Sequence, residues 1–483
     1  MSGIRDRMNR LRGIPSNDPE DGRGKPPAAE DGQAAKAAPP DEQSEETGLR
    51  DAGAAAAAAA ETGGLPGICR DRQDGRAESA GADGVSPEEA EEEPLHPLFA
   101  AMGVKLARNA HGSFLLRRVE VPLDTRHGDH RFAQLLEAAP ALGAFHGSDE
   151  SVAADRVLFF DLETTGLGVG AGNVPFMIGL GYVQGGSYAV EQTVIRHPAE
   201  ERAMLAYLLE LLPRFPYLAT YNGKTFDWPV LESRFIMNGF GRVDYKPKHL
   251  DFLHPSRSVW RNTLASCKLS RIEEERLGIF RKDDLPGAMA PQMYFRFLSD
   301  GNPAHLEGVY RHNEWDMLAL ACLAVRFGFF LDGRLGTDVT MPTEPEELLR
   351  TGLWLEKMGF GRLAEPLFAR LAQAAEPSPS WCLPLAARDK RCGNWERAVV
   401  LWQKAASEEE RLPAATGEAH IELAMYHEHR ERNYAAALGY AETALELAAR
   451  RLSLHRGDPK RRAELEAIRK RAERLRRKLG RDI

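Results

Sequence analysis

The strongest constraint on the fold is a short apolar run that ends at two carboxylates. Val157 to Phe160 are all apolar, which is typical of a strand buried on both faces, and Asp161-Leu162-Glu163 follows directly. Side chains two residues apart in a strand point to the same face, so Asp161 and Glu163 are expected to face one space. Two such carboxylates repel each other unless a cation lies between them, and hard divalent cations such as Mg²⁺ or Mn²⁺ prefer oxygen ligands.

A third carboxylate follows a second predicted strand. In Tyr221-Asn222-Gly223-Lys224-Thr225-Phe226-Asp227-Trp228-Pro229, a turn separates the strand from Asp227, and the proline suits the first turn of a helix. Asp227 could bind metal or only cap that helix. Asn222 and Lys224 are candidates for contacting a substrate phosphate, with a turn residue and a solvated lysine as the simpler interpretations.

A fourth carboxylate lies on a predicted helix near residue 316. His312 and Asp316 are four residues apart, so they share one helix face, and Leu318 to Val325 continue as an apolar helix. A helical His and Asp at this spacing are often only a surface pair. Together with the two earlier motifs, they complete a set of four acids and one base.

The three motifs, in this order, resemble those of DEDD-type 3′ to 5′ exonucleases from about Ala153 to Phe330. The phrases HLDFLH from His249, LSRIE from Leu269 and DLPG from Asp284 are similar to the bacterial YprB-type branch, whose members often append tetratricopeptide repeats. The resemblance implies an α/β fold: a ribonuclease-H-like mixed sheet flanked by helices, over residues 151–332.

The resemblance also implies a two-metal mechanism on single-stranded RNA or DNA. Four acids would hold two Mg²⁺ or Mn²⁺ ions, with His312 as the general base: Asp161, Glu163, Asp227 and Asp316. Asp161 would hold both ions, Glu163 and Asp316 the ion that activates water, and Asp227 the second ion. A histidine base usually precedes its aspartate by five residues in the wider superfamily and a tyrosine base by four, so His312 departs from the pattern. Two alternatives stay open, an inactive nucleic-acid-binding adaptor and a structure-specific endonuclease.

The regions around this domain have different compositions. Residues 1–94 are dominated by Ala, Gly, Pro, Glu, Asp and Arg, which predicts a disordered low-complexity tail, and residues 95–150 predict a lead-in segment of short strands. Residues 345–450 predict an all-α domain of tetratricopeptide-like repeats, because similar turns into a helix begin near Gly361, Gly393 and Arg432, close to the repeat period of about 34 residues. A plain helical bundle is the alternative. Such repeats favour a protein partner.

Residues 451–483 predict a basic terminal helix. Its apolar positions are spaced along one helix face with Arg and Lys elsewhere: Leu465, Ile468, Ala472, Leu475 and Leu479. We expect this helix to cap the helical domain with a solvated basic face.

Composition argues against several classes of protein. The net charge of −8 gives no sign of a nucleic-acid partner, although a local site could still bind phosphate through metal ions. Five widely spaced cysteines favour neither a disulfide framework nor a zinc site, so a reducing cytoplasm is expected. No apolar run reaches about 18 residues, so membrane insertion is not expected.

Four further features have weaker functional interpretations. Phe176 could stack on a base, although core packing of a strand is the simpler interpretation. Arg257 and Arg261 share a helix face and could hold a substrate backbone, although an ordinary basic surface is the favoured interpretation. His127 and His130 could bind metal, but a glycine-containing turn is favoured. The loop Gly166–Gly172 follows a strand without opening a helix, so it is no dinucleotide site, but it lies beside the acids.

Overall fold

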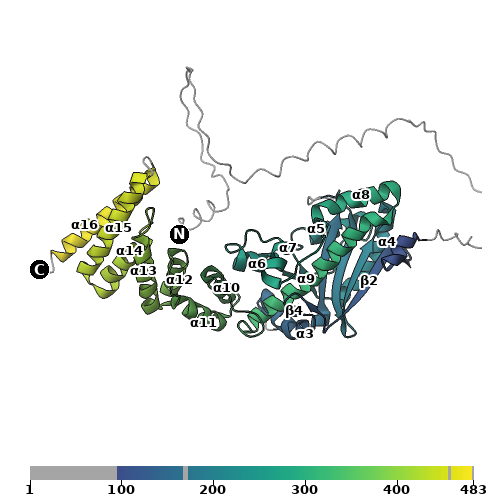
Figure 1. Cartoon of the computed structure of the whole chain (residues 1–483), viewed down its shortest axis with the longest axis horizontal. Coiled ribbons are helices and arrows are strands. Elements are labelled where there is room, and N and C mark those ends of the chain that lie inside the picture. The colour runs from purple at the N-terminus through teal and green to yellow at the C-terminus, as the bar shows by residue number, and fades with distance from the viewer. Residues whose placement is uncertain (1–94, 149, 167–171, 455–457, 481–483) are drawn as a thin grey trace, which may run out of the picture. The chain divides into compact units, whose positions relative to one another are not determined.

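The computed structural model describes residues 95–480 apart from 149, 167–171 and 455–457 (Figure 1). The predicted disordered tail, residues 1–94, therefore lies outside the described residues, as does most of the glycine-rich loop. Within the described residues a mixed sheet is followed by a region composed only of helices, which confirms the predicted fold class.

The sheet has seven strands in the order β1-β2-β7-β6-β5-β8-β9. Their bounds are β1 (Val104–Asn109), β2 (Gly112–Pro122), β5 (Val157–Thr164), β6 (Pro175–Gln184), β7 (Ser187–Val194), β8 (Tyr217–Thr220) and β9 (Lys248–Asp251). The strands from β1 to β5 in this order pair antiparallel, whereas β8 pairs parallel with both β5 and β9. The carboxyl ends of β5, β8 and β9 therefore meet at one edge of the sheet.

The first two strands of the predicted lead-in segment, β1 and β2, belong to this same sheet. β2 pairs antiparallel with β7 from Leu115↔Val194 to Pro122↔Ser187, and β1 forms the outer edge. Two short strands, β3 (Arg126–His127) and β4 (His130–Arg131), form a separate hairpin.

Strand β5 divides the domain into two apolar cores because its side chains alternate. Val157 and Phe159 belong to the core on one face of the sheet, and Leu158, Phe160 and Leu162 belong to the core on the other. Every one of these five side chains is buried, as the continuous apolar run predicts for a central strand.

Helices cover both faces of the sheet. They are α2 (Pro97–Ala101), α3 (Gln134–Ala138), α4 (Glu201–Leu211), α5 (Asp227–Met237), α6 (Leu253–Trp260), α7 (Leu269–Ile272), α8 (Ala290–Asp300) and α9 (Glu307–Leu331). Buried residues of α4, α5 and α8 join the core that contains Leu158, whereas the apolar carboxyl half of α9 joins the core that contains Phe159. Helix α9 therefore lies along the face of the sheet to which Val157 and Phe159 point.

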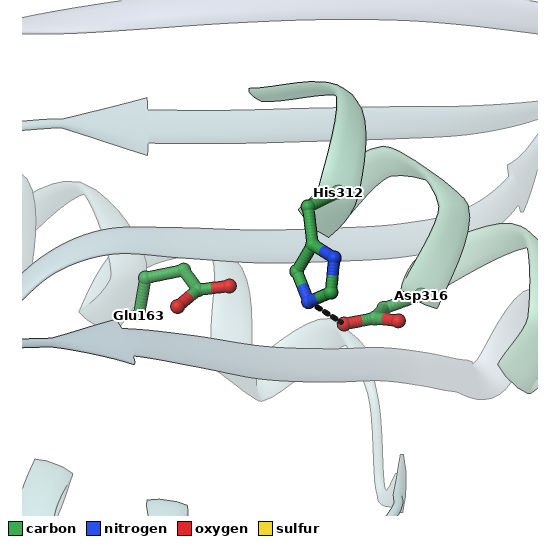
Figure 2. Close-up of side chains that lie close together, drawn as sticks. All are labelled: Glu163, His312 and Asp316. Carbon is green, nitrogen blue, oxygen red and sulfur yellow. Dashed lines mark ion pairs between the residues drawn. The ribbon is translucent and has the colours of Figure 1, made fainter. Parts of the chain in front are cut away.

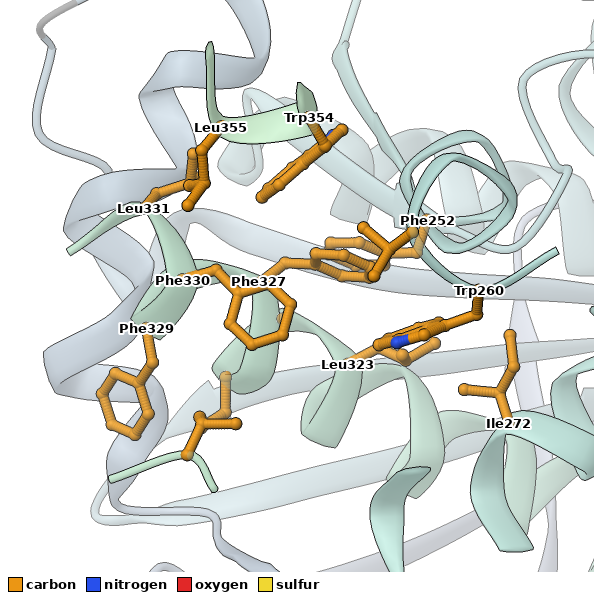
Figure 3. Packing of buried hydrophobic residues seen from close by; sticks show 14 of the residues in the cluster. Phe252, Trp260, Ile272, Leu323, Phe327, Phe329, Phe330, Leu331, Trp354 and Leu355 are labelled. Atoms are coloured by element: carbon orange, nitrogen blue, oxygen red, sulfur yellow. The ribbon is translucent and has the colours of Figure 1, made fainter. Parts of the chain in front are cut away.

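The second half of α9 also packs against the first helix of the helical region. Phe327 lies 5.3 Å from the ring of Trp354 and 5.3 Å from that of Trp260, measured between ring centroids. Figure 3 shows these rings together with Phe252 in one apolar cluster. The sheet domain and the start of the helical region thus share a continuous core.

The helical region contains α10 (Pro345–Lys357), α11 (Gly361–Ala372), α12 (Pro379–Cys392), α13 (Trp395–Glu409), α14 (Glu418–Tyr426), α15 (Tyr434–Leu454) and α16 (Pro459–Leu479). Helix α10 packs on α11, α12 on α13, and α14 on α15. In α16 the buried residues are Ile468, Ala472 and Leu475, which are three of the positions predicted to share one helix face. Among the described residues, no helix is both long enough and apolar enough to cross a membrane.

The β3–β4 hairpin contains the histidine pair that the sequence offered as metal ligands. Gly128 adopts φ +58 at the turn, a conformation that glycine reaches without steric cost. His127 stacks on Phe132 with ring centroids 6.2 Å apart, and His130 is 2% exposed. Neither histidine belongs to a group of potential metal ligands among the described residues, so the turn interpretation is the better one.

The burial of His130 predicts a loss of stability in acid. Burial, reinforced by Arg326, lowers the pKa of His130 from 6.5 to about 4, so the unfolded chain binds the proton more readily. The contribution of a neutral His130 is complete above about pH 6.5 and is lost as the pH falls toward 4. We expect His130→Gln to remove roughly 3 kcal/mol of this acid destabilisation. Urea unfolding at pH 7 and pH 4.5 measures it, and an unchanged pH dependence in the variant would contradict the expectation.

Candidate functional site

The carboxyl end of β5 presents two carboxylates to helix α9. Asp161 and Glu163 alternate with Leu162, which belongs to the opposite core, so both carboxylates share the face of Val157 and Phe159. Glu163 is only 8% exposed, and Asp161 is partly buried. Because side chains alternate along the strand, both acids face the side of the sheet on which α9 lies.

Helix α9 supplies the residues that face this pair. Its first turns are polar, and His312 and Asp316 lie one turn apart, with His312 Nε2 3.5 Å from Asp316 Oδ2. Figure 2 shows the carboxylate of Glu163 on β5 and the side chains of His312 and Asp316 on α9 turned toward a common space. One potential ligand atom from each of these three residues lies within 4.8 Å of the others, close enough to bind one cation.

Asp227 approaches from the neighbouring strand. It is the first residue of α5, after the turn that follows β8, and it is 5% exposed. A Cβ atom on Gly223 would lie 2.8 Å from Asp227 Oδ2, so the turn can approach the carboxylate this closely only with glycine. Burial, and then the nearby carboxylate of Asp251, raise the pKa of Asp227 from 3.8 to about 7.

The acids influence one another strongly. Burial raises the pKa of Asp161 well above its ordinary value, and Asp316 and Asp227 raise it further. Burial likewise raises the pKa of Glu163, with contributions from Asp161, Asp316 and Asp227. The four carboxylates predicted from the sequence therefore lie near enough to interact electrostatically, although Asp161 and Asp227 are not within the 4.8 Å group.

Asn313 stabilises the charge of Asp161 through a chain of hydrogen bonds. Its Nδ2 donates to Asp161 Oδ2 at 3.1 Å, while its Oδ1 accepts from Gln192 Nε2 at 3.0 Å. Gln192 in turn accepts from Arg117, which forms an ion pair with Glu314 on α9. Because both ends of the Asn313 amide are engaged, its donor is fixed toward Asp161.

A buried arginine neutralises the other side of the cluster. Arg281, whose side chain is 6% exposed, pairs with both Asp316 and Glu273 and approaches Asp284 at 3.1 Å. Burial raises the pKa of Glu273 to about 7, although its pairing with Arg281 opposes that rise. The positive charge of Arg281 reduces the repulsion that Asp316 exerts on the remaining acids.

Asp284 orients the ring of His312. Its Oδ1 lies 2.9 Å from His312 Nδ1, which favours a proton on that nitrogen and leaves Nε2 facing the acids. The carboxylates of Glu163 and Asp316 lie close enough to hold one divalent cation, with His312 beside them, and the raised pKa values of Asp161 and Glu163 fit such a site.

The turn between β8 and α5 is held by Asp251 at the end of β9. Asp251 Oδ1 accepts from the backbone N–H of Asn222 at 2.9 Å, and Oδ2 accepts from that of Lys224 at 3.3 Å. Asn222 has φ 70, which asparagine tolerates better than most residues, and its side chain accepts from Thr225. The side chain of Lys224 is exposed.

Phe176 must be removed from the candidate substrate contacts. Its ring is fully buried in the core that contains Leu158, on the opposite face of the sheet from the acids, and it stacks on Tyr294 with centroids 4.2 Å apart. The simpler interpretation, packing of a strand in the core, is the right one. Residues 167–171 of the loop beside the acids lie outside the described residues.

Three site residues were missed by reasoning from the sequence: Arg281, Asp284 and Asn313. Asn313 follows His312 directly and could have been found, because a polar residue buried on a helix needs a hydrogen-bond partner. Arg281 and Asp284 lie 35 and 28 residues from their partners on α9, and no local pattern indicates those contacts.

A mixed sheet whose central strand ends in two carboxylates, facing a helix with a third, defines a nuclease-like domain of the RNase H superfamily. The family model described as the RNase H superfamily matches residues 158–327 of this chain. The curated relative "Uncharacterized protein YprB" of Bacillus subtilis (strain 168) is 33% identical over 344 residues, which cover 69% of this chain and 81% of the relative. The chain belongs to the family of YprB, and its sheet domain has the ribonuclease-H-like fold.

The raised pKa of Asp227 predicts a stability gain when its charge is removed. A carboxyl with a pKa of about 7 when folded and near 3.8 when unfolded binds its proton more tightly in the folded state. Its contribution to stability is complete below about pH 4 and is lost as the pH rises toward 7. Asp227→Asn should therefore raise the free energy of unfolding at pH 8 in EDTA by a few kcal/mol.

Denaturant unfolding with and without Mn²⁺ measures this effect. We expect Mn²⁺ to stabilise the wild type more than Asp227→Asn, because the ion replaces the missing proton. Asp244→Asn, at a side chain that is 94% exposed, is the matched control and should change stability by less than about 0.5 kcal/mol. A variant at Asp227 that is less stable than the wild type in EDTA at pH 8 would contradict the expected repulsion.

Proposed function

We propose that this chain is a metal-dependent 3′ to 5′ exonuclease that hydrolyses single-stranded nucleic acid. The observation that supports this most is the convergence of Asp161, Glu163, Asp227 and Asp316 at one edge of an RNase H superfamily sheet. The acids come from two strand ends and one long helix, so the fold itself, and not a local loop, brings them together. Their mutual repulsion favours a role in binding cations over a structural role.

In this proposal the acids hold two Mg²⁺ or Mn²⁺ ions. Asp161 would contribute to both ions, Glu163 and Asp316 to one, and Asp227 to the other. When bound, the ions would supply the positive charge that stabilises the attacking and leaving oxygens of an in-line displacement at phosphorus. Asn222 and Lys224 would contact the phosphate from the turn that precedes Asp227.

His312 is the proposed general base. Its Nε2 would take a proton from water while Asp284 holds Nδ1 in place, and Arg281 pairs with Asp316 beside it. The water oxygen bonds to phosphorus as the bond from phosphorus to the 3′ oxygen of the preceding nucleotide breaks. The products are a nucleoside 5′-monophosphate and a new 3′ hydroxyl, whose oxygen takes up a proton.

The proposed partner of the helical region is a protein. Helices α11, α13 and α15 begin at Gly361, Trp395 and Tyr434, close to the spacing of tetratricopeptide repeats, and this supports three degenerate helical hairpins from α10 to α15. Repeats of this type present an extended surface to a protein. A cytoplasmic location is part of the same proposal.

Removal of the Asp161 carboxylate tests the proposed activity. Asp161→Ala should lower Mn²⁺-dependent release of nucleotides from a 3′-labelled oligonucleotide by at least about a thousandfold, because several kcal/mol of transition-state stabilisation are lost. Asp244→Asn is the control and should keep full activity. Wild-type rates in Asp161→Ala would refute the assignment of the site.

A circular single strand distinguishes exonuclease from endonuclease action by the same acids. The wild type should leave the circle intact and degrade the same strand once it is linear. Cutting of the circle at a comparable rate would replace the proposed exonuclease with an endonuclease.

The roles of His312 and Asp284 can be separated by a pair of substitutions. His312→Ala should lower kcat by about 10² to 10⁴, the range of general base catalysis, while calorimetry finds Mn²⁺ binding nearly unchanged. Asp284→Asn should lower kcat less, and it should have no further effect when combined with His312→Ala, because it acts by orienting that ring. Loss of Mn²⁺ binding in His312→Ala would instead make the histidine a metal ligand, and additive losses in the double variant would exclude the positioning role.

A further inference from the structure

A groove between α6 and α10 is lined by basic residues and lies close to the proposed active site. Its volume is about 510 Å³, and its ionisable lining residues are all basic: His254, Arg257, Arg261, Arg350 and Lys357. In a chain with a net charge of −8, a concentration of cations without an acidic residue is unusual. Such a groove attracts an anion through the field of the combined charges.

Most of these cations are free to bind a ligand. Arg350 pairs with Glu346 at 2.7 Å. Among the residues that the structure describes, no carboxylate pairs with Arg257, Arg261 or Lys357, and all three are exposed. The buried arginines of the acid cluster, by contrast, are neutralised by carboxylates, as Arg281 is by Glu273 and Asp316.

The cations form two rows on facing helices. Arg257 and Arg261 are four residues apart and lie on one side of α6, Arg261 directly after its last residue. Arg350 and Lys357 lie two turns apart on α10. Trp260 Nε1 donates to Glu347 Oε1 at 2.8 Å, and Arg276 pairs with the same carboxylate at 3.0 Å, so the two helices are held together. Trp354 lines the groove and belongs to the apolar cluster of Figure 3.

The first residue of α6 is tied to the acid site. Asp251 Oδ1 accepts from the backbone N–H of Leu253, where α6 begins, and also from that of Asn222, in the turn that precedes Asp227. Arg257 is near enough to Tyr221 to act on it electrostatically. Arg257, the first arginine of the row on α6, therefore lies one helical turn after the residue that Asp251 ties to the turn bordering the acids.

We propose that the groove between α6 and α10 binds the sugar–phosphate backbone of the nucleic acid whose 3′ end enters the acid site. This rests on the proposed exonuclease function and names the path of the strand upstream of the scissile bond. Trp354 is only 5% exposed, so the groove offers no aromatic face for a base. Backbone contacts without base contacts imply binding that is independent of sequence and sensitive to salt.

The test measures binding of 5′-labelled oligonucleotides of 3 and 20 nucleotides by fluorescence anisotropy, in the full chain with Asp161→Asn to prevent cleavage. Adding Arg257→Gln and Lys357→Gln should weaken binding of the long strand by about tenfold at 100 mM salt and reduce the slope of log affinity against log salt by about 1.4. Binding of the short strand should be weakened much less, because few of its phosphates reach the groove. Lys105→Gln with Arg242→Gln, two exposed cations elsewhere, is the matched control.

Each outcome supports or overturns the groove separately from the activity. A long strand that binds the groove variant with wild-type affinity and slope overturns the inference, even if the wild type is an exonuclease. Length-dependent binding that the substitutions weaken supports the groove, even if no hydrolysis is detected. Binding of a polyglutamate peptide in place of the oligonucleotide overturns it in favour of an acidic protein. Should the double variant fail to fold, Arg261→Gln alone must show a slope reduced by about 0.7.

Discussion

Mutual repulsion among buried carboxylates is the constraint on which the rest of the nuclease-like domain depends. Asp161 and Glu163 share one face of β5, and Asp316 and Asp227 are near enough to raise their pKa values further. A sheet that places such a group at its centre loses stability near neutral pH, because the raised pKa values of Asp161, Glu163 and Asp227 favour their protonated forms. The domain tolerates this cost through the large apolar cores on both faces of the sheet, and a bound cation would relieve the same repulsion.

The polar contacts around the site can be understood as responses to that repulsion. Asn313 donates to Asp161, and Arg281 pairs with Asp316, so two of the acids keep a partner that stabilises their charged form. Each partner is fixed from behind, Asn313 by Gln192 and Arg281 by Glu273. The acids are thereby held in position before any ion binds, which lowers the cost of ordering them around one.

The acids could be proposed from the sequence because each of them follows a local rule. Asp161 and Glu163 end an apolar strand, Asp227 begins a helix after a glycine turn, and Asp316 lies one turn from His312. Contacts between distant segments follow no such rule, so Arg281 and Asp284 were missed. Phe176 was misplaced as a substrate contact for a related reason. Strand β6 is buried on both faces, and only its register, in which Asp161 pairs with Gly179, shows that Phe176 points away from the acids.

Asp251 links the acidic site to the basic groove, and this link explains why charges of opposite sign can lie so close together. Its carboxylate accepts from the backbones of Asn222, Lys224 and Leu253, so one side chain fixes both the turn before Asp227 and the start of α6. Its negative charge also raises the pKa of Asp227. The cations of α6 begin beyond this carboxylate and do not pair with it. In the proposed function they would therefore leave the acids to the metal ions while remaining available themselves to phosphates of the same strand.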